Sequence, residues 1–204
     1  MWRDLVKRQP LVNRQAAALR ERARARRQSR EWSAPYLPGH RKRALILDVA
    51  RKHSLLVLVE TGTYEGETSY WLRRHFERIV TVELEPRLFA QARVRLSPYE
   101  NIETIEGDSL AALPGILASL DSPALFWLDS HACTTKSASG GSPAAGELEL
   151  ILSQPLPSGG RHVVLIDDVR LLGGDGWPTL DELSAIAAAH GRTLEVADDI
   201  ARVI

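Results

Sequence analysis

The fold of this chain is decided by residues 59–68, which read Val59-Glu60-Thr61-Gly62-Thr63-Tyr64-Glu65-Gly66-Glu67-Thr68. Residues 55–59 are all aliphatic and predict a strand that is buried on both faces. Residues 68–76 predict a helix, so the two glycines stand at a strand-to-helix turn. Glycine there lets the backbone approach a ligand and leaves the amide groups of the helix N-terminus facing it. Glu60 is then a candidate to hold a cation or a polar group of the ligand, and a glycine turn without a ligand is the alternative.

Length and composition indicate an ordinary globular protein. The chain has 204 residues, 44% of them hydrophobic and 25% charged, which suits one domain with an appendage. The single cysteine, Cys133, excludes an internal disulfide and argues against a cysteine-based zinc site. No apolar run is long enough for a membrane span, and the N-terminus lacks the apolar core of a secretory signal. We therefore expect a cytoplasmic protein.

The charge is unevenly distributed along the chain. Residues 1–43 hold 13 Lys and Arg against three acidic residues, a net charge of +10, and the remainder carries −10. We expect a basic arm and linker at 1–40, helical over 11–32, before a domain at 41–204. Such an arm could bind an anionic surface, nucleic acid or another subunit, so it is a candidate for homodimer formation. Nucleic acid is disfavoured because no aromatic residues alternate with the arginines to stack on bases.

After the glycine turn, strand patterns and helix patterns alternate. Segments rich in apolar or β-branched residues at 79–83, 102–105, 124–129 and 163–167 predict further parallel strands. Helices are expected at 41–53, 86–96, 110–120, 143–152 and 178–190, and a closing hairpin at 193–197 and 200–204. Repeated βα units of this length predict an α/β fold with a doubly wound, mainly parallel sheet and helices on both faces.

An acidic residue follows each of the five expected parallel strands. The set is Glu60, Glu83, Asp108, Asp129 and the pair Asp167-Asp168. Single members have structural explanations, because Asp108 is a plausible N-cap of the next helix and Glu83 could cap the helix behind Pro86. Together they favour a ligand site, since ligands of open parallel sheets bind outside the carboxyl ends of the strands.

The position of Glu83 indicates a nucleoside-containing cofactor. It lies 21 residues beyond Gly62, where an acidic residue accepts hydrogen bonds from ribose hydroxyls. The spacing Gly62-x-x-x-Gly66 departs from the G-x-G-x-x-G of dinucleotide sites and disfavours a nicotinamide dehydrogenase. With these residues the sequence resembles class I S-adenosylmethionine-dependent methyltransferases, because Glu60, Gly62 and Gly66 match the family's E/D-x-G-x-x-x-G signature.

The resemblance covers about residues 41–204 and implies a Rossmann-like, seven-stranded sheet with an antiparallel C-terminal strand. More narrowly, segments 59–68, 126–131, 147–151 and 164–168 are similar to a bacterial methyltransferase-like group. The implied cofactor is S-adenosylmethionine, bound by Glu60, Gly62, Thr63, Tyr64, Gly66, Thr68, Glu83, Asp108 and Ser109. Asp108 would lie near the adenine, and Asp129 stands where the family has its substrate-side acid.

The implied reaction is O-methylation of a small-molecule or saccharide hydroxyl. His131, two residues past Asp129, is suited to act as general base near neutral pH; a loop histidine that only bonds backbone is the alternative. Asp129, Asp167 and Asp168 form an oxygen-rich set that suits Mg²⁺. This set resembles macrocin-type O-methyltransferases, which carry Asp-x-Asp after strand four; here His131 replaces the second Asp. Helix capping is the alternative role for Asp167 and Asp168.

Two competing functions remain open at the level of sequence. One is a non-catalytic module with the same fold, associated with glycan or natural-product biosynthesis. The other is nucleic-acid methylation directed by the basic arm. The sequence after strand four, Asp129-Ser130-His131-Ala132, disfavours this second alternative because it lacks the Asn/Asp-Pro-Pro-Tyr/Phe motif of nucleic-acid methyltransferases.

Overall fold

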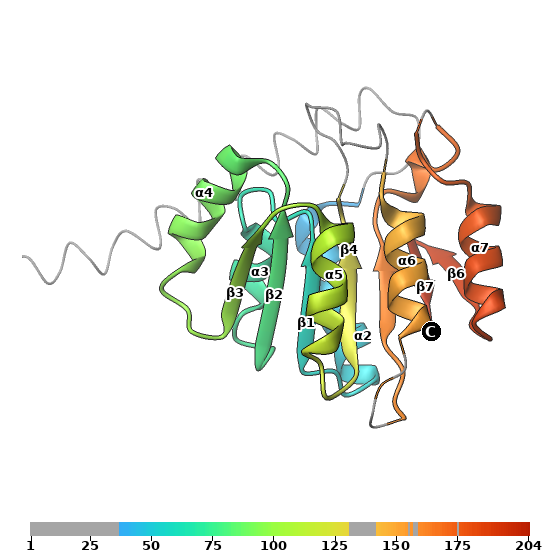
Figure 1. Ribbon diagram of the computed structural model, residues 1–204, viewed down its shortest axis with the longest axis horizontal. Helices are drawn as coiled ribbons and strands as arrows, with labels where there is room; N and C mark the ends of the chain where they lie inside the picture. The colour runs from blue at the N-terminus through green and yellow to red at the C-terminus, as the bar shows by residue number, and fades with distance from the viewer. Residues whose placement is uncertain (1–36, 131–141, 155, 157–158, 175) are drawn as a thin grey trace, which may run out of the picture. The chain divides into compact units, whose positions relative to one another are not determined.

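The structure is a computed structural model that describes residues 37–130, 142–154, 156, 159–174 and 176–204 (Figure 1). The chain divides into two compact units, residues 1–42 and residues 43–204. The expected basic helix at 11–32, and with it the arm, lies outside the described residues. So do His131 and Cys133.

Strands and helices alternate along the second unit as the sequence predicts. Helix α2 (Gly39–Lys52) spans the division between the two units and leads into β1. The elements that follow are β1 (Val57–Thr61), α3 (Glu67–Leu72), β2 (Arg78–Glu83), α4 (Pro86–Leu96), β3 (Ile102–Glu106), α5 (Ser109–Ala118), β4 (Ala124–Leu128), α6 (Ala144–Ser153), β5 (Val163–Ile166), the 3₁₀ turn η1 (Val169–Leu171), α7 (Leu180–Ala189), β6 (Leu194–Ala197) and β7 (Ile200–Val203).

The seven strands form one sheet in the order β3-β2-β1-β4-β5-β7-β6. Strands β1 to β5 pair in parallel, and β7 runs antiparallel to both of its neighbours, β5 and β6. The expected Rossmann-like, mainly parallel sheet with an antiparallel C-terminal strand is therefore confirmed. The chain moves outward from β1 to β2 and β3 and then returns to β4 on the other side of β1. This reversal opens a crevice at the carboxyl ends of β1 and β4, where ligands of such sheets bind.

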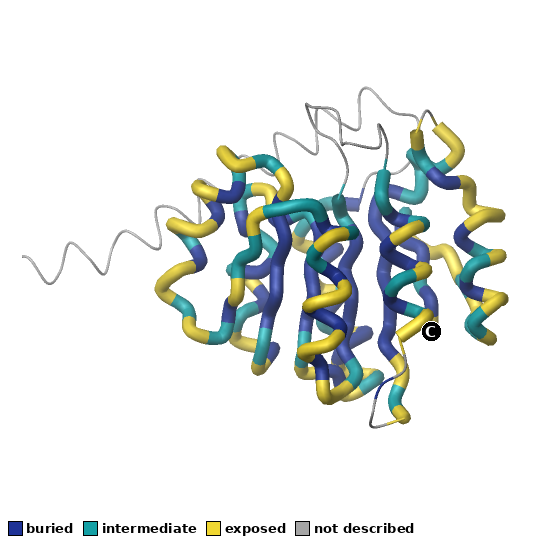
Figure 2. The backbone as a smooth tube through the Cα atoms, viewed as in Figure 1, coloured by how far each residue is buried: buried dark blue, intermediate teal, exposed yellow. Residues whose placement is uncertain are grey.

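The central strands are buried on both faces, which explains their continuous aliphatic sequence (Figure 2). Alternate side chains of the strands pack on one face against a shared apolar cluster from α5, α6 and α7, which includes Leu113, Leu148 and Leu183. In Figure 1, residues 43–52 of α2 and helix α3 lie on the opposite face. The helices thus cover both faces of the sheet, as a doubly wound fold requires.

One helix is shorter than the sequence predicts. The pattern at 68–76 extends to Phe76, but α3 ends at Leu72. The Asn101 side chain, which precedes β3, donates hydrogen bonds to the carbonyl oxygens of Arg73 at 2.8 Å and Phe76 at 3.0 Å. These carbonyls are satisfied by a residue distant in sequence, so the local pattern could not show where the helix ends.

The glycines of the turn are required by packing within the protein itself. Gly62 has φ +87°, and a Cβ there would lie 2.4 Å from the carbonyl oxygen of Asp129. Gly66 has φ +72°, and a Cβ there would lie 3.0 Å from a methyl group of Leu96 in α4. The turn therefore packs directly on the backbone that leaves β4, and this contact needs glycine whether or not a ligand binds.

We expect Gly62→Ala to destabilise the protein by about 3 kcal/mol or more, because the new Cβ overlaps a backbone carbonyl and the residue needs a positive φ. Gly115→Ala is the matched control. Gly115 lies inside α5 with nothing within 4 Å of its Cβ position, so alanine there should stabilise by about 0.5–1 kcal/mol. Urea unfolding measures both. Equal stabilities for the two variants would contradict the role given to Gly62.

Candidate functional site

Glu83, at the end of β2, holds the glycine turn through its carboxylate. Its Oε2 accepts a hydrogen bond from the backbone N–H of Tyr64 at 2.7 Å, and its Oε1 accepts from the N–H of Glu85 at 2.9 Å. The amides of Gly62 and Thr63 donate to the carbonyl oxygen of Val82 at 2.9 and 3.1 Å. A carboxylate oxygen can accept two hydrogen bonds. Counting the described residues, each oxygen of Glu83 retains capacity for a ligand hydroxyl.

Glu60 lies beneath the turn rather than on its surface, with 1% of its side chain exposed. Its Oε2 accepts hydrogen bonds from the hydroxyl of Ser69 at 2.6 Å and from the hydroxyl of Thr81 at 2.8 Å. Burial raises the pKa of Glu60 to about 7, and the negative charge of Asp129 adds to the rise. The hydroxyls of Ser69, Thr81 and Thr68 oppose it. A cation arriving nearby would favour ionised Glu60.

The other expected cofactor residues border the same crevice. Tyr64 has φ +51° and a side chain that is 39% exposed, whereas Thr63 is buried and its hydroxyl pairs with that of Thr81 at 2.6 Å. Asp108 is the N-cap of α5, because its Oδ1 accepts from the N–H of Leu110 at 2.8 Å. The capping role considered from sequence for Asp108 is therefore confirmed, and Ser109 begins the helix in a buried position.

Three aspartates converge at the carboxyl ends of β4 and β5. One carboxylate oxygen each from Asp129, Asp167 and Asp168 lies within 4.8 Å of the other two. Two oxygens on opposite sides of a bound Mg²⁺ are about 4.2 Å apart, so this spacing is close to what one cation requires. The donors are all carboxylates, the ligands that hard divalent cations prefer. The three carboxylates of the set suggested by the sequence lie close together, and these residues fit a divalent cation.

Asp168 is also fixed by an ion pair. Its backbone adopts φ +59°, and its Oδ1 accepts a hydrogen bond from Nη1 of Arg170 at 2.7 Å. Arg170 is buried and pairs as well with Asp199 in the turn between β6 and β7. The N–H of Asp168 in turn donates to Oδ1 of Asp167 at 2.7 Å. Tertiary contacts therefore hold the Asp-Asp pair at the end of β5 in one orientation.

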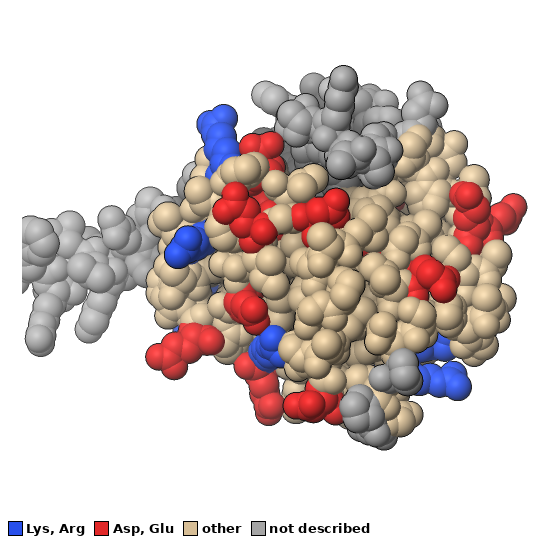
Figure 3. Space-filling view, viewed as in Figure 1, with Lys and Arg blue, Asp and Glu red and all other residues tan. Residues whose placement is uncertain are grey.

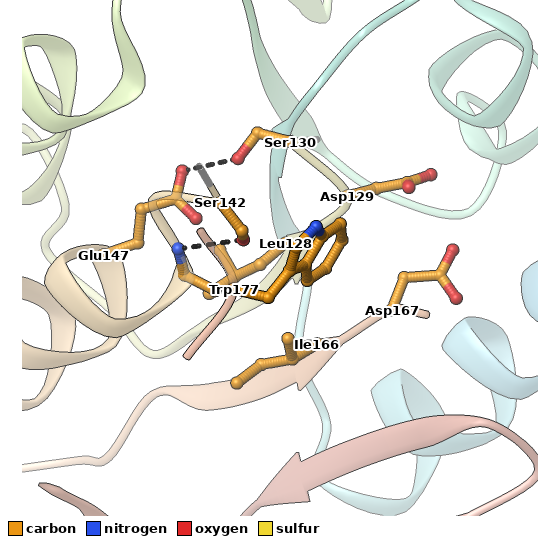
Figure 4. Close-up of a pocket in the computed structure, with 9 residues that line it drawn as sticks. Leu128, Asp129, Ser130, Ser142, Glu147, Ile166, Asp167 and Trp177 are labelled. Carbon is orange, nitrogen blue, oxygen red and sulfur yellow. Dashed lines mark hydrogen bonds between the residues drawn. The ribbon is translucent and has the colours of Figure 1, made fainter. Parts of the chain in front are cut away.

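A pocket opens beside this cluster, between the ends of β4 and β5 and the start of α6 (Figure 4). It encloses about 200 Å³ of empty space, part of it open to solvent. Its lining is Leu128, Asp129, Ser130, Ser142, Ala144, Glu147, Ile166, Asp167 and Trp177.

Glu147 is a buried acidic residue of this pocket that the sequence analysis did not propose as a site residue. Its side chain is 0% exposed, and its Oε1 accepts a hydrogen bond from the hydroxyl of Ser130 at 2.9 Å. Burial raises its pKa to about 6, although the hydroxyls of Ser109, Ser130 and Thr61 oppose the rise. The only sequence signal was its place in the segment 147–151, where an acid interrupts the apolar face of α6.

Acidic side chains also lie on the surface near this edge of the sheet. On the face shown in Figure 3 they gather above the carboxyl ends of β2 and β3 and beside the start of α5.

Within the described ranges, no helix combines the length and the apolar character that a membrane crossing needs.

The known proteins named below, which are similar to this chain in sequence or in structure, are methyltransferases. No protein-family model matches the chain. Over 112 residues it is 30% identical to an rRNA adenine N-6-methyltransferase from Saccharopolyspora erythraea, a match that covers 55% of the chain and 29% of the relative. The chain thus spans less than a third of that relative's length.

Two solved structures share the fold. The O-methyltransferase TomG from Streptomyces achromogenes, in complex with S-adenosylmethionine, has a TM-score of 0.52 and 20% identity, covering 89% of this chain and 86% of that one. The 23S rRNA methyltransferase ErmE has a TM-score of 0.54 and 19% identity, covering 82% and 68%. The chain therefore has the fold of the class I S-adenosylmethionine-dependent methyltransferases.

Glu60 should make the stability of the protein depend on pH. The folded chain keeps the Glu60 proton up to about pH 7 and the unfolded chain only to about 4.5, so folded protein binds more protons in this window. The free energy of unfolding therefore falls as pH rises through it, by about 3 kcal/mol in total from this group.

The free energies of unfolding of wild type and Glu60→Gln are compared at pH 6.5 and at pH 8. Relative to the variant, we expect wild type to lose about 1 kcal/mol of stability between these two pH values. The other titrating groups contribute equally to both proteins, so their contributions cancel when the two free energies of unfolding are subtracted. Urea unfolding at both pH values measures these free energies, and Glu100→Gln, at an exposed position, is the control. A constant difference between wild type and Glu60→Gln would show that Glu60 is not protonated in the folded state.

Proposed function

We propose that this protein is an S-adenosylmethionine-dependent methyltransferase that methylates a hydroxyl group of a small-molecule or saccharide acceptor, with the help of a divalent cation. The convergence of Asp129, Asp167 and Asp168 carries the proposal. Asp129 follows β4, the neighbour of β1 and its glycine turn, and Asp167 and Asp168 follow β5, the next strand in the sheet. A cofactor at the turn and an acceptor at the aspartates would therefore meet across one crevice.

The cofactor would supply an electrophilic methyl group on a sulfonium ion. Glu83 would accept hydrogen bonds from its ribose, with the free capacity of the carboxylate described above. Gly62, Thr63, Tyr64 and Gly66 would form the turn that it contacts, and Asp108 and Ser109 would border its adenine. Glu60 and Thr68 would act beneath the turn, where the positive charge of the cofactor would favour the loss of the Glu60 proton.

The metal, with Mg²⁺ as the candidate, would be held by Asp129, Asp167 and Asp168 and would lower the pKa of an acceptor hydroxyl bound to it. Bound S-adenosylmethionine would supply the methyl group to the acceptor oxygen, and the electron pair of the broken carbon–sulfur bond would stay on sulfur. The hydroxyl proton must leave to a base. His131, two residues beyond Asp129, is the proposed base, and Asp129 is the second candidate.

The first test is cofactor binding. We expect the full-length protein to bind S-adenosylmethionine in a calorimetric titration and Glu83→Ala to weaken binding at least tenfold, because it removes a ribose acceptor and loosens Tyr64. Glu100→Ala, exposed in the turn before β3 at the opposite edge of the sheet, should bind like wild type. If wild type binds no S-adenosylmethionine, the proposal falls.

The second test is metal binding. We expect Mn²⁺ or Mg²⁺ to bind in calorimetry and Asp167→Asn to lose at least tenfold in affinity, because one of three carboxylates becomes neutral. S-adenosylmethionine affinity should not change. Asp121→Asn, at an exposed position before β4, is the control. No binding of Mg²⁺, Mn²⁺ or Ca²⁺ to wild type, with or without cofactor, would remove the metal from the proposal.

Methylation of an RNA adenine is a second candidate, favoured by the similarity to the rRNA adenine N-6-methyltransferase over 112 residues. An amino group on a base needs no metal to lower its pKa, so the three aspartates would then lack a role in the reaction. Transfer of radiolabelled methyl groups to rRNA, and not to polyhydroxylated small molecules, would favour this candidate. Cofactor binding without transfer to either class of acceptor would favour the non-catalytic module.

A further inference from the structure

Asp168 has a backbone conformation that is uncommon for residues other than glycine. Its φ of +59° and ψ of +42° lie in the left-handed region, and a residue keeps such a conformation where the surrounding contacts fix it. Nη1 of Arg170 donates a hydrogen bond to its Oδ1 at 2.7 Å, and the N–H of Leu171 donates to its carbonyl oxygen at 2.8 Å. The turn η1 therefore fixes both the side chain and the backbone of Asp168.

The turn η1 is itself attached to Asp199, in the two-residue turn between β6 and β7. The N–H of Val169 donates to the carbonyl oxygen of Asp199 at 3.0 Å, and the N–H of Arg170 donates to its Oδ1 at 2.8 Å. Nη1 of Arg170 also donates to its Oδ2. Arg170 thus joins the carboxylates of Asp168 and Asp199 through one nitrogen, and all three side chains are at most 5% exposed.

Glycine would adopt the backbone of position 199 more easily than aspartate. Asp198 has φ +55° and Asp199 has φ +65°, the left-handed pair of conformations that favours glycine in the second place of a two-residue hairpin turn. The Asp198 side chain is 57% exposed, whereas that of Asp199 is 4% exposed. A carboxylate buried there needs a cationic partner to offset its lost hydration. The contact with Arg170 therefore accounts for an aspartate at this position.

The same contacts orient two of the three carboxylates of the proposed metal site. Arg170 holds the side chain of Asp168 directly. The left-handed backbone of Asp168 also directs its N–H to Oδ1 of Asp167, at 2.7 Å. Figure 4 shows the carboxyl groups of Asp167 and Asp129 on the same side of the site. A carboxylate oxygen can accept two hydrogen bonds, so Asp167 and Asp168 keep the capacity to bind a cation.

We propose that Arg170 and Asp199 are positioning residues of the metal site, and that Arg170 strengthens the binding of a divalent cation although it is a cation itself. The inference rests on the function proposed above and adds the β6–β7 hairpin to the proposed site. Arg170 and Asp199 would act through Asp168, without binding the metal. Groups that hydrogen-bond to metal-binding side chains contribute about tenfold to hundredfold to the affinity for the metal.

Two simpler roles of Arg170 give different expectations. If Arg170 only balances the charge of the aspartates, its removal leaves a more negative site, and a divalent cation binds more tightly. If it only attaches the hairpin, its removal lowers the stability of the protein and leaves the metal affinity of the folded variant unchanged. A positioning role means that the cation binds more weakly. The direction of the change in affinity therefore separates the three roles.

The experiment measures the affinity of the full-length protein for Mn²⁺ by calorimetry. We expect Arg170→Met to bind Mn²⁺ at least tenfold more weakly than wild type, and Arg170→Lys, which keeps the charge, to lie between them. The double variant Arg170→Met with Asp199→Asn has the net charge of wild type and should also bind at least tenfold more weakly. It removes both members of a buried pair, so it replaces Arg170→Met if that variant does not fold.

The matched control changes the pair formed by Arg202 and Asp198, which belongs to the same hairpin. Nη2 of Arg202 lies 3.8 Å from Oδ2 of Asp198, and the two side chains are 24% and 57% exposed. Arg202→Met with Asp198→Asn makes the same two chemical changes at a more exposed pair. We expect this double variant to bind Mn²⁺ as wild type does. Thermal unfolding checks that each variant is folded.

The outcomes separate this inference from the function on which it rests. An Mn²⁺ affinity equal to or above that of wild type, in folded Arg170→Met or in its double variant with Asp199→Asn, would overturn the positioning role alone. No Mn²⁺ binding to wild type, with or without S-adenosylmethionine, would remove the metal and the positioning role together. S-adenosylmethionine is also titrated without metal, and its failure to bind wild type would count against the methyltransferase proposal alone.

Discussion

The structure depends on one close contact, the approach of the Gly62 backbone to the backbone that leaves β4. A Cβ at Gly62 would lie 2.4 Å from the carbonyl oxygen of Asp129, so no other residue fits. This contact joins the turn expected to hold the cofactor with the strand end that carries Asp129. Because β1 and β4 are adjacent at the reversal of strand order, the two halves of the proposed site share a single backbone junction.

Several carboxyl groups lie around this junction, and they differ in how burial and ion pairing affect their charge. Glu60 is buried and keeps its proton to about pH 7. Asp168 is paired with Arg170, which Asp199 holds from the far turn of the β6–β7 hairpin. Glu147 is buried, and one of its carboxylate oxygens has no hydrogen-bond partner among the described residues. The remaining negative charge favours cationic ligands, which suits both a sulfonium cofactor and a divalent metal.

The similarities to known proteins point to two acceptor classes. The shared fold includes an O-methyltransferase and an rRNA methyltransferase at comparable TM-scores of 0.52 and 0.54, so the fold alone does not choose between them. Our proposal of a hydroxyl acceptor rests on the three converging aspartates, which fit a divalent cation that would lower the pKa of a bound hydroxyl.

The sequence by itself determined the sheet, because the periodicity of strands and helices is a local pattern. It also determined the edge at which the acidic residues gather, because parallel strands have their carboxyl ends on the same side of the sheet. It also predicted the three-aspartate set, though only folding could bring residues 129 and 167 together. Tertiary structure decided the rest. Asn101 binds carbonyl groups just after the end of α3, Gly62 is necessary for packing against the backbone after β4, and Glu147 is a pocket residue because α6 turns that side chain inward. Each of these depends on contacts between segments distant in the sequence, which a local pattern does not record.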